Sequence, residues 1–212
     1  MTQVSLTELV AAAQSGDRLI SFPTDTVPAL AARPDRAGLI YATKQRSQTK
    51  PLILMGGDIE DLWAYVTGNA DERAIWQAVM AQHFPGALTL VLPASDRLPP
   101  AMNPTDPTTI GIRVPNRAIA RQILRQTGPL ATTSINRSGE PPLQTIAEIN
   151  AQFPQVLTLS ETELYSLESG LLSDPSATQA ATQAAGVPST VAKWTGSGWK
   201  ILRQGGVVLD QG

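Results

Sequence analysis

Hydrophobic positions along this chain change spacing repeatedly, from helical periods to short continuous runs and back. Residues 5–15 carry apolar side chains at helical spacing, and the pattern stops at Gly16, which is typical of a helix with a glycine after its last turn. Residues 19–22 then form a short apolar run, which predicts a strand, and Pro23 ends it. Thr24, Asp25 and Thr26 gather at the tip of that strand, where ligands often bind in α/β folds.

The same patterns predict alternating helices and strands along the rest of the chain, an arrangement that favours an α/β fold. The expected helices cover residues 35–44, 58–66, 71–82 and 116–126, with Asp35 and Asn116 as N-caps. The expected strands cover residues 52–55, 87–92, 109–114, 129–132 and 156–159, and a hairpin joins 187–191 to 199–202 around Gly196-Ser197-Gly198. Residues 173–186 are expected to form a loop or a short helix.

Composition narrows the class of protein. The 212 residues suit one domain, and we expect residues 1–212 to form it, because no stretch rich in Pro, Ser or Gly is long enough to be a linker. The absence of cysteine excludes disulfides and thiolate chemistry. No apolar run approaches the ~20 residues of a membrane helix, and the N-terminus lacks a signal pattern, so the expected location is cytoplasmic, without membrane contact.

The single histidine limits the available chemistry further. His83 excludes a multi-histidine metal site, and no metal-ligating residues are predicted. It precedes Phe84-Pro85-Gly86 at an expected helix end, and no G-x-S-x-G motif accompanies it. A structural position is therefore favoured over a catalytic one.

Positive charge is concentrated in one segment of a chain whose formal net charge is -2. Lys44, Arg46 and Lys50 lie within seven positions of each other, just ahead of the apolar run at 52–55. Arginine and lysine at this spacing can hold the oxygens of a polyphosphate. The alternative is a solvated helix end with cations near its C-terminal dipole.

Two further segments contain residues that are suited to binding a ligand. Arg113 lies inside the apolar strand at 109–114, where a buried cation needs a carboxylate, supplied either by the protein or by a ligand. Residues 132–139 form a turn rich in hydroxyl and amide side chains, which suits phosphate or ribose oxygens although it lacks the Walker spacing and lysine.

The order of these segments resembles the YrdC-type threonylcarbamoyl-AMP synthase family. The matching segments, from about residue 18 to 206, are FPTDTV at 22–27, KQR with a following KPL at 44–52, FPGALTLVLPA at 84–94, GIRVP at 111–115, TTSINRSGEPP at 132–142, PST at 188–190 and ILRQG at 201–205. The resemblance implies a single-domain α/β fold, a twisted mixed sheet flanked by helices, with a deep basic cleft. It also implies a nucleotidyltransferase reaction in which L-threonine, bicarbonate and ATP, with Mg²⁺ carried by the nucleotide, give threonylcarbamoyl-AMP and pyrophosphate. That product serves tRNA modification, so tRNA or tRNA-modifying proteins are implied as downstream partners.

The resemblance also assigns site residues by position. It implies that Lys44, Arg46 and Lys50 act on the phosphates as the catalytic group. It implies ATP contacts from Arg46, Lys50, Thr109, Ser134, Asn136, Pro142 and Arg203, and threonine contacts from Thr24, Met55, Arg113, Thr132 and Ser189. For Arg113, the resemblance favours the carboxylate of threonine as the partner.

This chain departs from the family pattern at three places. Residues 26–32 read TVPALAA instead of the usual TVYGLGA, which suggests a stiffer loop and a missing aromatic wall of the threonine pocket. Met55 stands where many members have histidine, and Ile135 replaces the alanine of SAN. The alternatives to an active synthase are a nucleotide-binding paralogue with an altered or lost amino-acid substrate, and an RNA-binding protein. The acidic net charge opposes RNA binding.

Overall fold

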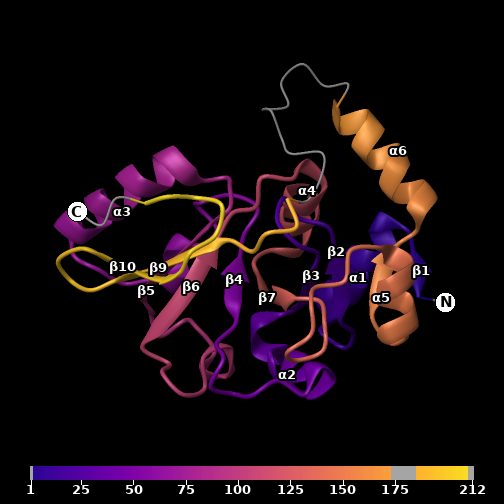
Figure 1. Cartoon of the computed structure of the whole chain (residues 1–212), viewed down its shortest axis with the longest axis horizontal. Coiled ribbons are helices and arrows are strands. Elements are labelled where there is room, and N and C mark those ends of the chain that lie inside the picture. Colours follow the sequence, from indigo (N-terminus) through magenta and orange to yellow (C-terminus); the bar gives the residue numbers. More distant parts are fainter. Residues whose placement is uncertain (1, 173–184, 210–212) are drawn as a thin grey trace.

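The computed structural model describes residues 2–172 and 185–209, and over these residues one mixed sheet of ten strands organises the chain (Figure 1). The strand order is β1-β8-β2-β3-β7-β4-β6-β5-β9-β10. The strands are β1 (Gln3–Val4), β2 (Ile20–Phe22), β3 (Ala29–Ala32), β4 (Ile53–Met55), β5 (Leu88–Pro93), β6 (Thr109–Arg113), β7 (Leu130–Ser134), β8 (Leu157–Leu159), β9 (Thr190–Trp194) and β10 (Trp199–Arg203). The predicted fold class, a mixed sheet with flanking helices, is confirmed.

Strand direction alternates irregularly across the sheet. Strand β8 runs parallel to both β1 and β2, β4 runs parallel to β6, and β5 runs parallel to β9, whereas the other neighbouring pairs are antiparallel. The antiparallel neighbours β3, β7 and β4 meet the parallel pair β4–β6 near the middle of the sheet. Residues 58 to 105 positions apart in the chain, such as Ile53 and Gly111 or Ala29 and Ser134, therefore lie side by side there.

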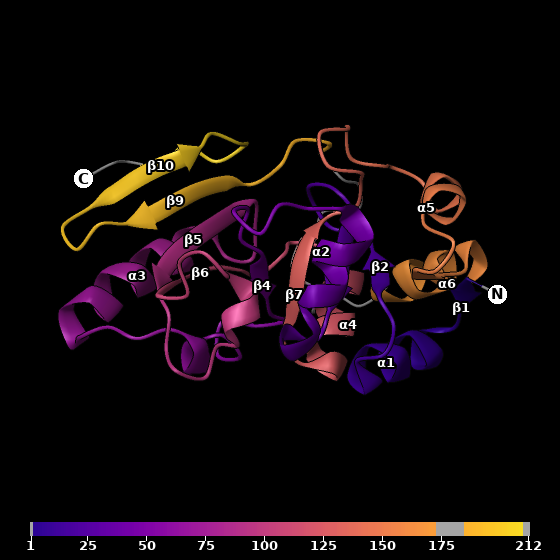
Figure 2. The same ribbon diagram turned by 90° about the horizontal axis from the view of Figure 1, so that it is seen from below.

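Helices cover the sheet in two groups. The helices are α1 (Leu6–Ser15), α2 (Gly38–Lys44), α3 (Ala70–His83), α4 (Ala118–Thr127), α5 (Ile146–Gln152) and α6 (Glu161–Leu172). Helices α1 and α4 pack together and bury Leu9 and Ile123 in one apolar cluster, while α2 and α3 bury Ile40 and Trp76 in another. Figure 2 shows the hairpin β9–β10 lying apart from α1, α5 and α6 along the length of the molecule.

Local signals explain the best-predicted helices. Helix α1 begins with a reciprocal capping box between Ser5 and Glu8 and ends at Gly16, whose φ of 75° is left-handed, as the glycine position predicts. Helix α3 has the same box between Asn69 and Glu72. His83 lies in the last turn of α3, so its predicted helix-end position is confirmed.

Several sequence predictions of helices were wrong. The predicted helix 58–66 reduces to a 3-10 turn at Trp63–Tyr65. Asp35 pairs with Arg33 instead of capping a helix, and α2 starts later, at Gly38. Asn116 is not the N-cap of α4 either, because Arg117 occupies that position. Helices α5 and α6 and strand β1 were not predicted, although α5 carries a Thr145–Glu148 capping box.

The segment at residues 28–32, where the sequence departs from the family pattern, is not a loop. Ala29–Ala32 form strand β3, which is buried and pairs with β2 and β7. Alanine favours helices in isolation, so pairing on both sides imposes the strand. The predicted stiff loop is therefore wrong.

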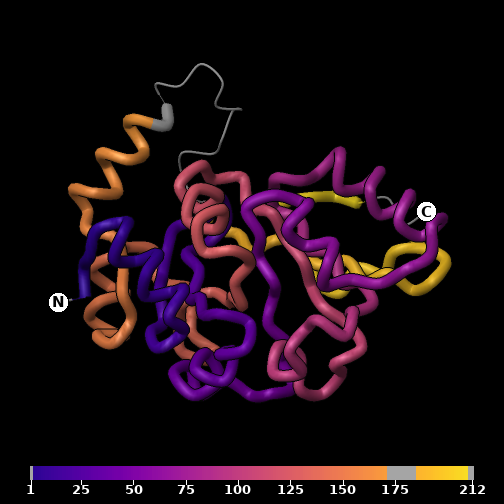
Figure 3. The backbone as a smooth tube through the Cα atoms, turned by 180° about the vertical axis from the view of Figure 1, so that it is seen from behind, coloured from indigo at the N-terminus to yellow at the C-terminus, as the bar shows by residue number. Residues whose placement is uncertain are grey.

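The two ends of the sheet lie far apart, with β1 at one end and the hairpin β9–β10 at the other (Figures 1 and 3). The hairpin itself was predicted, and Gly196, with φ of 94°, lies in its turn. Of the region predicted as a loop or short helix, residues 173–184 lie outside the described residues. No described helix is long and apolar enough to cross a membrane.

Candidate active site

A cleft of about 450 Å³ lies over the middle of the sheet. Its walls come from β3, β7, β4, β6, β5 and β9, together with the segment after α2 and the end of β10. Of the predicted site residues, the cleft is lined by Arg46, Met55, Thr109, Arg113, Thr132, Ser134, Ser189 and Arg203. This volume and mixed polarity fit a small-molecule site.

Arg46 reaches the cleft because the end of α2 turns sharply. Gln45 has a left-handed φ of 49°, and the N–H of Arg46 donates to the carbonyl of Tyr41. The guanidinium of Arg46 then donates to the carbonyls of Lys50 and Pro51, both at 3.0 Å. The backbone after α2 thus holds this cation at the cleft wall.

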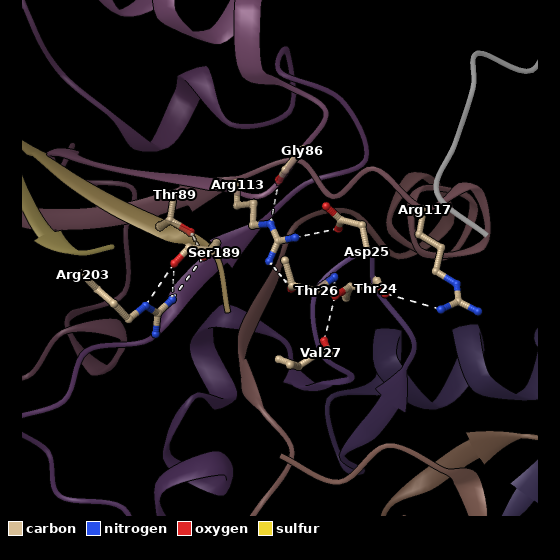
Figure 4. A network of polar contacts seen from close by, with 10 residues as sticks. All are labelled: Thr24, Asp25, Thr26, Val27, Gly86, Thr89, Arg113, Arg117, Ser189 and Arg203. Atoms are coloured by element: carbon tan, nitrogen blue, oxygen red, sulfur yellow. Dashed lines mark hydrogen bonds and ion pairs between the residues drawn. The ribbon is translucent and has the colours of Figure 1, made fainter. Parts of the chain in front are cut away.

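Arg203 faces the same cleft from the opposite strands. Its guanidinium donates to the carbonyl of Ser189 at 3.0 and 2.8 Å and to the Ser189 hydroxyl at 3.2 Å (Figure 4). Desolvation lowers the pKa of both Arg46 and Arg203, and the charge of Arg203 lowers that of Arg46 further. Neither pairs with a carboxylate within the described part of the chain. Two arginines in one cleft, neither of them paired with a carboxylate, favour an anionic ligand, and the Asp106 carboxylate in the same cleft lies beside Lys193 instead.

Lys44 lies beneath the cleft instead of in its wall. Its side chain is 2% exposed, and its ammonium donates to the Ser134 carbonyl and, at 3.0 Å, to Asn136 Oδ1. Burial, with the nearby charges of Arg46 and Lys50, lowers the pKa of Lys44 to about 7. Asn136 in turn donates to the carbonyls of Arg137 and Glu140. Lys44 and Asn136 therefore organise the turn that presents Ser134.

Arg113 is held from three sides (Figure 4). Its Nη2 contacts Asp25 Oδ1 at 2.6 Å, its Nη1 donates to Thr26 Oγ1 at 2.8 Å, and its Nε donates to the Gly86 carbonyl at 3.0 Å. The residue is 4% exposed, and desolvation lowers its pKa while Asp25 opposes that shift. Of the two alternatives for its partner, the structure contains the protein carboxylate. These contacts use three of the five guanidinium N–H groups, and Arg113 is part of the cleft wall.

Of the other predicted threonine ligands, Thr132, Ser189 and Met55 line the cleft, whereas Thr24 does not. Thr132 donates to the Ile53 carbonyl at 3.0 Å, and Ser189 Oγ lies 2.9 Å from Thr89 Oγ1. Met55 is 4% exposed and is the register partner of Arg113. Thr24 does not line the cleft, because its hydroxyl donates to the Val27 carbonyl at 2.7 Å and accepts from the Thr26 N–H.

Two predicted ATP ligands lie outside the cleft wall as well. Lys50 is exposed and Pro142 is half-buried, and neither lines the cleft, whereas Thr109 and Ser134 do. Pro28 stands where the family pattern has tyrosine, and it lines a different cavity. The next residue, Ala29, lines the cleft. The missing aromatic residue therefore does not open this cleft directly.

Sequence reasoning missed several residues of the cleft. Asp106 accepts from the hydroxyls of Thr108 and Thr109, which lower its pKa, and lies 3.7 Å from Lys193. Asn103 donates to the carbonyl and hydroxyl of Thr109. Residues 103–108 read as an ordinary polar turn, so no local signal distinguished them. Asp25 was noted at a strand tip, but its pairing with Arg113 depends on tertiary packing.

The fold and the cleft define an α/β protein with a small-molecule pocket whose lining includes Arg46, Arg113 and Arg203. Residues 12–171 match the Sua5/YciO/YrdC family model, described as "Telomere recombination", and the chain belongs to this family. It is 33% identical over 158 residues to the threonylcarbamoyl-AMP synthase of Chromohalobacter salexigens, covering 73% of this chain and 83% of that one. The Bacillus subtilis protein of the same name is 37% identical over 132 residues, covering 59% of this chain and 36% of that one.

Solved structures share the fold. Sua5 from P. abyssi in complex with L-threonine superposes with a TM-score of 0.75 at 24% identity, covering 96% of this chain and 56% of that one. E. coli YciO gives a TM-score of 0.71 at 21% identity, covering 95% of this chain and 89% of that one.

Proposed function

We propose that this protein is a threonylcarbamoyl-AMP synthase that uses ATP and L-threonine. The observation that carries the proposal is the pair Arg46 and Arg203, which flank one cleft while donating to backbone carbonyls. Such fixed, uncompensated cations suit the phosphates of a nucleotide. Membership in the family, with relatives that bear this enzyme name, supports the same assignment.

The reaction has two bond-forming steps. The amine of threonine attacks bicarbonate, and loss of water leaves a carbamate with a new N–C bond. A carbamate oxygen then attacks the α-phosphorus of ATP, and the bond to the β-phosphate oxygen breaks to release pyrophosphate. The protein's main contributions are alignment of the two anions and neutralisation of the charge that develops on the leaving group.

Each end of the cleft has a role in this proposal. Arg46 and Arg203 hold the phosphates, and Ser134 and Thr109 contact the nucleotide. Arg113 directs its remaining N–H groups at the carboxylate of threonine, while Thr132 and Ser189 offer polar atoms beside it. Lys44 and Asn136 support the Ser134 turn, so their effect on the nucleotide is indirect. Thr24 shapes the loop that carries Thr26.

The remaining ligands follow from the chemistry. Bicarbonate supplies the carbamoyl carbon. Mg²⁺ arrives with ATP, because phosphate oxygens and waters suffice as its ligands. The mixed anhydride product must pass to an acceptor, and we assign that role to the machinery that modifies tRNA.

The test is pyrophosphate release from Mg·ATP and bicarbonate, with and without L-threonine, and identification of the nucleotide product by mass spectrometry. We expect threonine-dependent release and the mass of threonylcarbamoyl-AMP. Arg203→Met should abolish ATP binding at concentrations that saturate the wild type, whereas Arg97→Met, an exposed control outside the cleft, should not. ATP binding without threonine-dependent turnover would indicate a paralogue with another substrate.

A further inference from the structure

Three residues without polar side chains form a strip on the floor of the cleft, which the contacts proposed above leave unused. Ile53, Gly111 and Val91 are register partners across β4, β6 and β5. The row continues to Lys193 on β9, the register partner of Val91. Register partners share one face of a sheet, and all four residues line the cleft. From β4 to β9 the row spans three strand spacings, about 14 Å, which leaves room for a planar base.

Asp106 lies beside Lys193, where the strip ends. Thr109, two residues before Gly111 on the same face of β6, donates its hydroxyl to Asp106 Oδ2 at 3.0 Å, and Thr108 donates to Asp106 Oδ1. Lys193 Nζ lies 3.7 Å from Asp106 Oδ2. The side chains of Asp106 and Lys193 are 45% and 38% exposed, and both line the cleft. A ligand in the cleft can therefore reach both charged groups.

Asp106 has hydrogen-bonding capacity that the described residues do not use. A carboxylate offers about four acceptor positions, and the hydroxyls of Thr108 and Thr109 occupy two of those on Asp106. These hydroxyls and the charge of Lys193 lower the pKa of Asp106, so the group is ionised and only accepts. The ammonium of Lys193 only donates, and it is too far from Asp106 for a hydrogen bond. The pair thus presents a charged acceptor next to a charged donor.

The distribution of charge in the cleft orients a nucleotide along the strip. Arg46 and Arg203 attract the phosphates, whereas Asp106, the only carboxylate among the described residues that line the cleft, repels them. The uncharged base is therefore the part of the nucleotide that lies toward Asp106.

The chemistry of the pair selects among purine bases. Adenine carries an amino donor next to a ring-nitrogen acceptor, which complements a carboxylate beside an ammonium. A purine with an oxygen at position 6 places an acceptor where adenine has its amine. Such a base would either oppose the Asp106 carboxylate or leave it without a hydrogen bond, and both lower affinity.

We infer that Asp106 determines the base specificity of the cleft by accepting a hydrogen bond from the 6-amino group of adenine, while Lys193 donates to the adjacent ring nitrogen. The base lies over the strip of Ile53, Gly111 and Val91. The inference rests on the proposed binding of ATP, but it does not depend on the reaction with threonine. It restricts the nucleotide substrate to purines that carry a 6-amino group.

Isothermal titration of the full chain with three nucleotides tests the inference: ATP, inosine triphosphate and 2′-deoxy-ATP, each with Mg²⁺ and without L-threonine. Inosine triphosphate has an oxygen in place of the 6-amino group, whereas 2′-deoxy-ATP keeps the adenine and lacks a ribose hydroxyl. We expect ATP to bind about tenfold more tightly than inosine triphosphate, because one hydrogen bond to a charged group is lost. 2′-Deoxy-ATP should bind within about twofold of ATP, since its base is unchanged.

Asp106→Asn should bring the affinities of ATP and inosine triphosphate close to each other. An amide in this position can turn to accept from an amine or to donate to a 6-oxo group. Removing a negative charge affects the binding of both nucleotides, and this effect cancels in the ratio of their dissociation constants. Asp96→Asn makes the same change of charge at an exposed position outside the cleft and should keep the tenfold ratio.

A second pair of variants tests the donor. Lys193→Met should weaken ATP binding about tenfold relative to Lys200→Met, because the hydrogen bond from the ammonium is lost. Lys200 is the register partner of Lys193 on β10, is exposed and does not line the cleft, so both variants remove one positive charge from neighbouring positions. Equal affinities of these two variants for ATP would contradict a contact between Lys193 and the base.

The outcomes distinguish this inference from the proposed function. Equal binding of ATP and inosine triphosphate to the wild type, or a ratio that Asp106→Asn leaves unchanged, would overturn the inference. A loss of affinity for 2′-deoxy-ATP alone would assign Asp106 to the ribose and would also overturn it. Failure of all three nucleotides to bind would contradict both the inference and the proposed function. The expected ratio without threonine-dependent turnover would support the base assignment and contradict the proposed reaction.

Discussion

The ammonium group of Lys44 is engaged by the turn at residues 134–140, although its position in the sequence suggested a phosphate ligand. The sequence predicted a cluster of cations, and residue type alone does not distinguish Lys44 from Arg46. The difference comes from geometry, because α2 directs Lys44 inward, whereas the left-handed Gln45 redirects the chain and places Arg46 at the cleft wall. Burial of Lys44 depends on β7, which is about 90 residues away in sequence.

The lowered pKa of Lys44 predicts a specific dependence of stability on pH. Its pKa in the folded protein is about 7, below the ordinary lysine value of 10.5, so between these values the unfolded chain binds more protons than the folded one. The wild type should therefore gain stability relative to Lys44→Met as pH rises from 7 to 9.5. Urea unfolding at both values measures the difference. Subtracting the free energy of unfolding of Lys44→Met from that of the wild type cancels the contributions of the other titrating groups. A difference that does not change with pH would contradict the lowered pKa of Lys44.

The ion pair of Arg113 and Asp25 makes a second prediction at this scale. Both residues are buried, with side chains 5% and 6% exposed, so Asp25→Asn leaves an unpaired buried cation. We expect the free energy of unfolding to fall by about 3–5 kcal/mol. Urea denaturation measures it, with Asp35→Asn as control, because the exposed Arg33–Asp35 pair should contribute less than about 1 kcal/mol. If Asp25→Asn and Asp35→Asn lose similar free energies of unfolding, the buried Arg113–Asp25 pair contributes no more to stability than the exposed Arg33–Asp35 pair.

Among the elements, several with self-contained signals were predicted, although α5 was missed despite its capping box, and β3, which depends on its neighbours, was not predicted. The capping box of α1 and the apolar runs of β4 and β6 identify these elements locally. Strand β3 has the composition of a helix and becomes a strand only between β2 and β7. Of the predicted site residues in matched motifs, Arg46, Arg113 and Arg203 line the cleft, whereas Thr24, Lys50 and Pro142 do not. Asp106 and Lys193, which meet through the pairing of β5 with β6 and β9, were missed because that contact depends on tertiary packing.

The turn after β10 positions Arg203, and two adjacent glycines test this. A Cβ at Gly205 would lie 2.3 Å from the Pro188 carbonyl oxygen and 2.4 Å from the Thr190 nitrogen, whereas at Gly206 it would meet nothing within 4 Å. Gly205→Ala should therefore lower the free energy of unfolding by about 1–3 kcal/mol, because backbone must move. It should also weaken ATP binding, since Arg203 is two residues away.

Gly206→Ala is the matched control for this turn. Its effect on stability should stay within about 0.5 kcal/mol, and ATP affinity should be unchanged. Urea unfolding and isothermal titration of both variants give the comparison. If the two glycines respond alike, close packing at Gly205 does not position Arg203.

For the whole molecule, the cleft joins strands from both halves of the sheet. Ala29 and Ser134 come from β3 and β7, while Thr109 and Ser189 lie on or beside β6 and β9. A nucleotide held between Arg46 and Arg203 would contact both halves at once. Because such a ligand binds the folded chain and not the unfolded one, it should stabilise the molecule as a unit.

A thermal unfolding scan with a non-hydrolysable ATP analogue measures this effect. At a concentration about 100 times Kd, the gain is about 2.7 kcal/mol, which corresponds to a rise in Tm of about 5–10 °C for a chain of this size. Arg46→Met should lose most of the rise at the same concentration, whereas Arg36→Met, an exposed arginine outside the cleft, should keep it. Because both variants remove one positive charge, a nonspecific response to net charge would reduce the two shifts equally. A shift lost in Arg46→Met alone would locate the phosphates at the cleft, and an equal shift in both variants would exclude Arg46 as a phosphate ligand.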